Sequence, residues 1–263
     1  TNQFRIGGVK LNFDGSPQGK TAWLSHPYLK APEGQEAGYL GYPTFNDEQA
    51  FEYVETAFAN GWQVMTHANG DAAIEQFLNA VENANNKLGK KDRRPVLIHG
   101  QTIRQEQVNR LKELGIFPSL FPMHTFYWGD WHVDSVLGHP RADFISPTNS
   151  VKEQGLMFST HHDAPVALPN AMRVLDATVN RTTRTNQVLG PDQRVSVYTA
   201  LQAMTTWPAY QHFEEASKGQ LKQGMQADLI ILDKNPLKIE PENLHKLQIL
   251  YTISRGKTVY TKQ

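Results

Sequence analysis

The sequence contains no cysteine, which excludes disulfide bonds and thiolate metal ligands. Any bound metal must therefore be held by histidine, carboxylate or a modified lysine, and these ligands suit hard or borderline ions. The opening Thr1-Asn2-Gln3 shows neither an initiator methionine nor a basic-then-apolar leader. No signal peptide is visible, and cytoplasmic, periplasmic and secreted locations all stay open.

Net charge and long apolar runs are also missing. Lysine plus arginine and aspartate plus glutamate both number 26, so neither a nucleic acid nor an anionic membrane is an expected partner. The hydrophobic residues lie in short blocks, far below the roughly 18 consecutive apolar residues that a membrane span requires. We therefore predict a soluble chain that buries one sizeable core.

Short β-rich runs alternate with amphipathic helical segments along the first part of the chain. The predicted strands cover residues 5–13, 62–66, 95–99, 116–120 and 156–160. The predicted helices between them start at Asn46, near Asp71 and at Arg104, and Gly61 and Gly115 end the first and the third. This alternation is typical of parallel βαβ units and predicts an α/β fold.

The pattern becomes helical beyond Asp163, with predicted helices at 170–180 and 196–206 and a shorter one ending at 217. Strand-like runs follow at 228–233 and 250–260, with a hairpin turn at Arg255-Gly256-Lys257. We predict a partial barrel domain at 1–217 and a small β element at 218–263. Two long irregular stretches, 14–45 and 121–148, follow strand ends, where loops often carry function.

The predicted parallel strands are too few to close an eight-stranded barrel. A sheet covered by helices does not leave long edges unpaired without a risk of aggregation. Either an N-terminal partner segment completes a barrel, or the strands form a smaller doubly wound sheet that stands alone.

Polar residues stand at or near the carboxyl ends of the predicted strands: Lys10, His67, His99 and Asp163. In a barrel these ends converge. Two neutral imidazoles and a carboxylate suit a borderline divalent ion, with an open position for water. The pattern predicts a hydrolytic metal site.

Each residue has a simpler interpretation when it is taken alone. His67 is then a hydrogen-bonded histidine, Lys10 a surface partner of Asp14, and Asp163 a cap before the following segment. Independent structural accidents rarely supply Lys, His, His and Asp at successive strand ends in that order, and this order favours the metal site.

The same residues lie within longer motifs. These are Val9-Lys10-Leu11 through Asp14-Gly15-Ser16, His67-Ala-Asn-Gly-Asp71, His99-Gly-Gln101, Asp163-Ala-Pro-Val166, and Gly219 through Asp233. Together they resemble the amidohydrolase superfamily, in particular the amidohydrolase-3 group that includes N-substituted formamide deformylases and exoenzyme regulatory proteins. The likeness covers almost the whole chain.

The resemblance implies the C-terminal part of a (β/α)8 TIM barrel, about strands 4 to 8, plus a share of a composite β-sandwich at 218–263. It assigns Lys10 to the fourth barrel strand, His67 to the fifth, His99 to the sixth and Asp163 to the eighth. It also implies that the missing N-terminal part of the same protein supplies the remaining strands.

The metal ligands that the resemblance implies are Lys10, His67, His99 and Asp163. Lys10 would be carboxylated and bridge two divalent ions, with zinc the expected metal, and Asp163 would also be the catalytic proton shuttle. A carbamate makes chemical sense because a lysine ammonium repels a cation. Two departures stand out: the first-strand His-x-His pair is absent from the chain, and His161-His162 precede Asp163 where the family more often has a small residue.

The resemblance implies hydrolysis of a carbon-nitrogen bond in a small amide or formamide substrate, with the isolated fragment weak or inactive. His124, Tyr127 and Trp128 follow the predicted seventh strand and are candidate substrate contacts, although aromatics there also pack over a barrel mouth. The alternative is a non-catalytic regulatory or binding protein on the same scaffold. An anion-binding α/β domain ranks last, because no Gly-rich phosphate loop is present. The oligomeric state stays open, and a homo-oligomer is compatible with the sequence.

Overall fold

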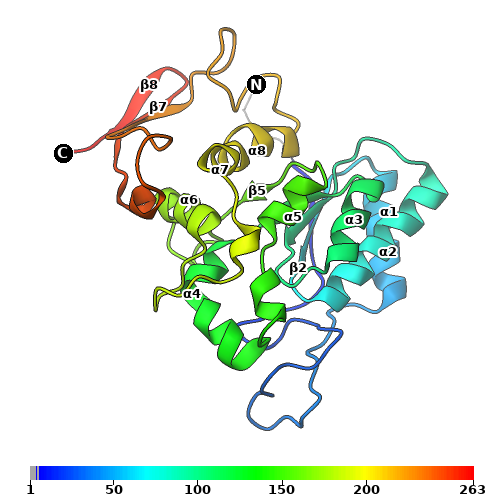
Figure 1. Cartoon of the computed structure of the whole chain (residues 1–263). Helices are drawn as coiled ribbons and strands as arrows, with labels where there is room; N and C mark the ends of the chain where they lie inside the picture. The colour runs from blue at the N-terminus through cyan, green and yellow to red at the C-terminus, as the bar shows by residue number, and fades with distance from the viewer. Residues whose placement is uncertain (1–3, 5) are drawn as a thin grey trace.

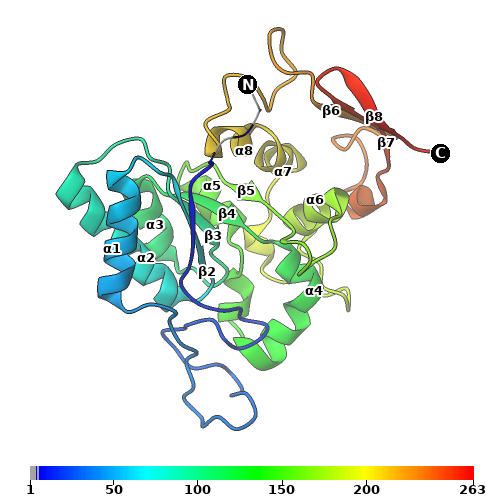
Figure 2. The same ribbon diagram turned by 180° about the vertical axis from the view of Figure 1, so that it is seen from behind.

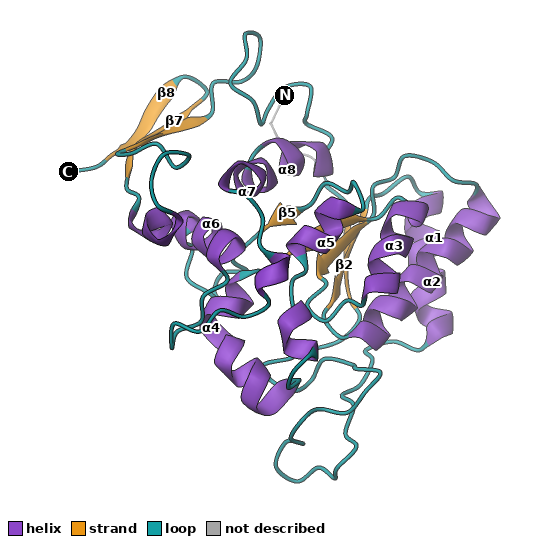
Figure 3. Ribbon diagram, in the orientation of Figure 1, coloured by secondary structure: helices purple, strands orange, loops and turns teal. Residues whose placement is uncertain are grey.

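A computed structural model describes residue 4 and residues 6–263 (Figure 1). The predicted strand start at Arg5 and the opening tripeptide lie outside the described residues. Within them, the chain forms a five-stranded parallel sheet covered by helices and a separate three-stranded antiparallel sheet (Figure 3). No described helix is long and apolar enough to cross a membrane.

The strands of the parallel sheet are β1 (Val9–Asn12), β2 (Val64–Ala68), β3 (Val96–His99), β4 (Phe117–Leu120) and β5 (Ser159–Thr160). Each strand pairs in parallel with the one before it, so their spatial order is the chain order. A doubly wound sheet reverses its strand order at a switch point, whereas consecutive order is the arrangement in a barrel. The doubly wound alternative is therefore wrong, and the chain has the fold of part of a TIM barrel.

The helices α1 (Asp47–Ala59), α2 (Asp71–Leu88) and α3 (Gln105–Leu114) form a layer on one side of this sheet (Figure 2). Asn46 and Gln49 form a capping box at the start of α1. Gly115 ends α3 in the left-handed conformation with φ 69°. Fully buried Phe13, Phe77 and Leu97 belong to the core between this layer and the sheet.

The connection from β1 to α1 contains no helix or strand, as predicted, and projects away from the sheet (Figure 1). The second stretch predicted as irregular, 121–148, is instead largely helical. It holds α4 (Met123–Trp131), the π-helical turn η1 (His132–Val136) and the 3-10 turn η2 (Arg141–Phe144). The apolar and aromatic residues of α4 are distributed around the whole helix, so its sequence shows no amphipathic period.

The chain continues through α5 (Thr148–Glu153), β5, α6 (Ala171–Asn180), η3 (Pro191–Gln193), α7 (Val197–Met204) and α8 (Thr206–Gln211). The helix predicted at 196–206 is broken at Thr205, whose φ of −133° and ψ of −79° are not helical. This break separates α7 from α8 and was not visible as a glycine or proline in the sequence.

The tail forms β6 (Leu229–Leu232), η4 (Pro241–Lys246), β7 (Ile249–Ser254) and β8 (Lys257–Thr261). The three strands are antiparallel, and the predicted hairpin turn lies at Arg255 and Gly256, both with positive φ. Leu244 and Leu247 pack in one hydrophobic cluster with Met172 and Leu175 of α6, which ties the tail to the barrel part. The boundary at 217 and the sandwich assignment stay proposals.

Both outer strands of the parallel sheet, β1 and β5, have a parallel neighbour on one side only among the described residues. Phe4 and Ile6, just before β1, are each 75% exposed. Apolar side chains beside a strand that has one open edge form a surface to which another strand can add.

Candidate metal centre at the strand ends

The turns that follow β1 and β2 place the first of the predicted site residues. In His67-Ala-Asn-Gly-Asp71, a Cβ atom on Gly70 would lie 1.9 Å from the carbonyl oxygen of Trp23, so only glycine fits there. A Cβ atom on Gly15 would similarly lie 2.1 Å from Oγ1 of Thr21. The Gly70 contact brings the loop after β1 against the start of α2, and the Gly15 contact folds that loop on itself.

Asp14 connects the loop after β1 to the turn after β2 through hydrogen bonds. Its buried carboxylate accepts hydrogen bonds from the backbone N–H groups of Asn69 (2.9 Å), Gly70 (2.7 Å) and Trp23 (3.0 Å). Burial raises the pKa of Asp14 to about 7, and the three backbone donors act in the opposite direction. Asp14 is thus a structural acceptor and not the surface partner considered for Lys10.

A chain of imidazole rings crosses the carboxyl end of the sheet. Nδ1 of His67 lies 3.1 Å from Nε2 of His99, and Nδ1 of His99 lies 3.0 Å from Nε2 of His161. Nδ1 of His161 lies 3.0 Å from Oγ of Ser119 on β4. Burial lowers the pKa of His67, that of His99 well below its usual range, and that of His161 to about 3. All three rings are neutral near pH 7, and a neutral imidazole is the form that binds metal.

Lys10 and Asp163 lie beside these rings. Oδ2 of Asp163 is 3.9 Å from Nε2 of His99, and the Asp163 side chain is 41% exposed. Burial lowers the pKa of Lys10, while the charge of Asp163 acts to raise it. The Lys10 charge in turn contributes to lowering the pKa of both His67 and His99. The fold therefore gathers all four residues predicted from the strand ends.

Two of the described non-glycine residues with positive φ lie at this place. His99 has φ 75° and Asp163 has φ 54°, which is the left-handed region that side chains with a Cβ rarely adopt. Each such residue costs on the order of 1–3 kcal/mol and persists only where the surrounding structure holds it. The strain at these two residues is consistent with a functional site.

The spacing of the donor atoms can be compared with that of a metal ion. Two nitrogens about 2.0–2.1 Å from one tetrahedral zinc ion lie about 3.3 Å apart. The 3.1 Å between Nδ1 of His67 and Nε2 of His99 fits that separation closely. The described residues hold no group of three or more histidine, aspartate or glutamate side chains arranged for one ion, so further ligands are needed.

The residues predicted to contact substrate all lie on α4. His124 is 2% exposed, and its Nδ1 lies 3.0 Å from Nε2 of His132. Its ring centroid is 4.7 Å from that of Trp128, and the Arg184 guanidinium lies 4.8 Å from the Tyr127 ring. His124 is thus buried against Phe121, Trp128 and His132, near enough to His99 for its charge to contribute to lowering the pKa of that residue. The substrate role of all three predicted residues stays a prediction.

Three further residues belong to this arrangement, and the sequence assigned a ligand or catalytic role to none of them. His161 and Ser119 extend the imidazole chain, and Asn69 donates to the carbonyl oxygen of Gly15 that also contacts His67. The sequence signal for His161 was its unusual place two residues before Asp163. Ser119 carried no signal of its own.

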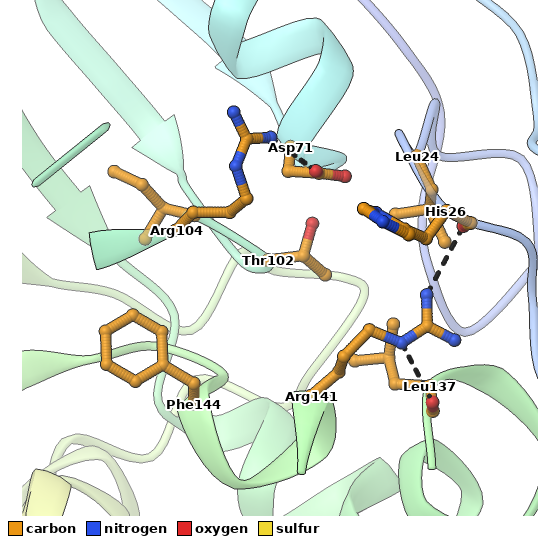
Figure 4. Close-up of a pocket in the computed structure, with 9 residues that line it drawn as sticks. Leu24, His26, Asp71, Thr102, Arg104, Leu137, Arg141 and Phe144 are labelled. Carbon is orange, nitrogen blue, oxygen red and sulfur yellow. Dashed lines mark hydrogen bonds and ion pairs between the residues drawn. The ribbon is translucent and has the colours of Figure 1, made fainter. Parts of the chain in front are cut away.

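A cavity of about 380 Å³ is lined by four apolar residues and by five polar or charged ones, which include Asp71, Arg104 and Arg141 (Figure 4). None of the four predicted ligands lines it. Thr102 lines the cavity, and its backbone N–H and hydroxyl both donate to the carbonyl oxygen of Asn69.

Consecutive parallel β/α units with neutral histidines at neighbouring strand ends are the arrangement found in barrel hydrolases that hold a metal. A model of the amidohydrolase family matches residues 1–260, and the chain belongs to this family.

Similar proteins agree with this membership. The chain is 30% identical to the putative amidohydrolase YtcJ of Bacillus subtilis (strain 168), over 98% of the chain and 47% of that protein. It is 25% identical to the N-substituted formamide deformylase of Arthrobacter pascens, over 85% of the chain and 41% of that protein. The solved structure of an uncharacterized metal-dependent hydrolase from Pyrococcus furiosus is 31% identical, with a TM-score of 0.75 over 90% of the chain and 46% of that structure. The chain thus spans about half the length of these relatives.

Proposed function

We propose that this chain carries part of the active site of a metal-dependent hydrolase that cleaves a carbon-nitrogen bond in a small amide or formamide. The observation that carries the proposal is the 3.1 Å approach of Nδ1 of His67 to Nε2 of His99, with Lys10 and Asp163 beside them. Family membership and the metal-dependent hydrolase of similar fold support the metal. The relative named as an N-substituted formamide deformylase supports the bond type.

A bound divalent ion, with zinc the expected one, would supply Lewis acidity toward a carbonyl oxygen and lower the pKa of water. His67 and His99 would hold that ion through the two nitrogens that face each other, Nδ1 of His67 and Nε2 of His99. Partial burial lowers the pKa of Lys10, which raises the fraction of the neutral amine. This amine would add to carbon dioxide and release a proton, and the resulting carbamate would be an anionic oxygen ligand.

Asp163 acts as the general base and acid. Its partly exposed carboxylate takes a proton from the attacking water and passes it to the leaving nitrogen. The position 3.9 Å from Nε2 of His99 puts the carboxylate beside the proposed ligand while leaving it open to solvent. The C–N bond breaks as the nitrogen gains that proton, and the carbonyl carbon keeps the oxygen from water.

We further propose that an N-terminal part of the same protein completes the barrel and adds the first-strand His-x-His ligands. Two observations support this: β1 and β5 each lack a second neighbour among the described residues, and the chain spans about half the length of its relatives.

Metal analysis tests the proposed function. The zinc content of the purified chain, measured by plasma mass spectrometry, is compared with that of a His67→Ala/His99→Ala double variant. We expect the double variant to lose the bound metal. A His139→Ala variant is the control, because His139 has a side chain 61% exposed and pairs with Asp143 away from the strand ends. Equal, non-zero metal content in all three proteins would remove His67 and His99 from the site.

A further inference from the structure

Another pocket lies at the amino ends of the parallel strands, opposite the candidate metal centre. Its volume is about 430 Å³, and it is lined by the connections that lead from α2 to β3, from α3 to β4 and from α5 to β5. Val96 begins β3 and His99 ends it, so about 10 Å of strand separates this pocket from the imidazole chain. None of the four predicted metal ligands lines the pocket.

Cationic side chains predominate among the charged residues of this pocket. The α2–β3 connection supplies four cations and one carboxylate to its lining: Lys90, Lys91, Asp92, Arg93 and Arg94. Among the described residues, Arg94 is the only one of these cations that forms ion pairs, with Asp92 at 3.0 Å and with Glu215 at 2.8 Å. Lys90 donates to the backbone carbonyl oxygen of Glu113 and Arg93 to that of Gly89, so neither charge is balanced by a carboxylate. Three cations of the pocket are therefore uncompensated.

The Arg94 wall of the pocket is held by its own contacts. The guanidinium lies 3.6 Å from the centroid of the Tyr210 ring and donates to the Tyr210 carbonyl oxygen at 2.6 Å. With its two ion pairs, these contacts leave 11% of the Arg94 side chain exposed. Nε2 of Gln63 donates to the backbone carbonyl oxygen of Arg94 at 2.7 Å. This wall is formed before any ligand binds, which lowers the entropy cost of binding.

Apolar residues line the same pocket beneath the cations. They come from the connections that lead into β4 and β5, and they are Ile116, Phe117, Leu156 and Met157. The pocket volume lies within the range of small-molecule sites, roughly 300–1,000 Å³. Uncompensated cations beside an apolar wall favour a ligand that has both a multiply charged anionic group and an apolar body.

We propose that this pocket binds a small phosphate monoester that carries an apolar ring. A phosphate monoester has a charge of about −1.5 to −2 at pH 7 and three acceptor oxygens, which suits three uncompensated cations better than the single charge of a carboxylate. Lysine and arginine side chains form charge-assisted hydrogen bonds with phosphate. The phosphate binds Lys90, Lys91 and Arg93, and the ring lies against the apolar wall. The inference is independent of the proposed metal site.

Calorimetric titration of the purified chain in the presence of a chelator tests the ligand class. Phenyl phosphate is the probe, and inorganic phosphate, benzoate and phenol are its matched comparisons. We expect phenyl phosphate to bind about 5-fold more tightly than inorganic phosphate, because only the ester has a ring to bury. Benzoate should bind more weakly than phenyl phosphate, and phenol should not bind. Absence of phenyl phosphate binding, or equal affinity for phenyl phosphate and either of the other anions, overturns the inference.

A pair of double variants tests the location. Lys90 and Lys91 are exposed, so Lys90→Gln/Lys91→Gln should fold normally and bind phenyl phosphate about 5-fold more weakly, since exposed ion pairs contribute modestly. Lys234→Gln/Lys238→Gln removes the same charge from exposed positions that do not line the pocket, and it should bind like the unaltered chain. Equal weakening in both double variants would mean that binding follows net charge, and this outcome also overturns the inference.

The His67→Ala/His99→Ala variant separates this inference from the proposed function. It should bind phenyl phosphate like the unaltered chain, because the pocket lies at the other end of the strands. Loss of phenyl phosphate binding in this variant would place the ligand at the strand-end histidines and refute the pocket. Loss of zinc with retained phenyl phosphate binding supports both proposals. Circular dichroism of each variant establishes that it is folded.

Discussion

Burial of His132 should make the protein lose stability in mild acid. His132 is 0% exposed, its Nε2 faces His124, and its Nδ1 has no hydrogen-bond partner. Burial lowers the pKa of His132 from 6.5 to about 3. The unfolded chain therefore binds a proton at pH values where the folded chain does not, and stability is fully present above pH 6.5 and falls as the pH falls toward 3.

The size of the stability loss follows from the difference between the pKa values of His132 in the unfolded and folded chain. A group that titrates at pH 6.5 only in the unfolded state removes about 1.4 kcal/mol of unfolding free energy between pH 7.5 and pH 5.5. The assay is urea denaturation of the chain and of His132→Asn at both pH values. An asparagine does not titrate, so the variant should lose about 1.4 kcal/mol less than the unaltered chain over that interval.

Two controls sharpen this experiment. The His139→Asn variant removes an exposed histidine and should keep the pH dependence of the unaltered chain. The absolute stability of His132→Asn does not enter the comparison, because only its change with pH is used. Parallel pH profiles for the unaltered chain and His132→Asn would refute the reasoning that His132 is held neutral by burial.

Further predictions concern the site, the turn after β2 and the sheet edges. Asp163→Asn in the intact enzyme should lower kcat about 10²- to 10⁴-fold with an unchanged melting temperature; retained turnover would remove Asp163 from proton transfer. Gly70→Ala should cost more than about 2 kcal/mol in urea unfolding, because its Cβ would overlap the Trp23 carbonyl, whereas Gly7→Ala meets no atom within 4 Å. The isolated chain should self-associate in sedimentation velocity through its unpaired β1 and β5 edges, and a stable monomer would contradict the open-edge interpretation.

Local sequence signals predicted much of the fold. Asn46 and Gly115 marked helix ends correctly, since a cap depends on a few neighbouring residues. The strand predicted at 156–160 shortens to Ser159–Thr160, and the helix α4 was missed. Strand length depends on the partner strand, and an all-round apolar helix shows no period, so neither could be read from a local pattern.

The candidate site likewise combines residues that the sequence predicts with contacts that only the fold creates. The sequence by itself determined that His67, His99 and Asp163 stand at or near strand ends and that Lys10 stands within a strand, because periodicity and turn residues mark where a strand stops. Only the tertiary structure decided that His99 meets His161, which is 62 residues away along the chain. That contact depends on β3, β4 and β5 lying side by side in register, and sheet register is set by packing of the whole layer rather than by any one segment.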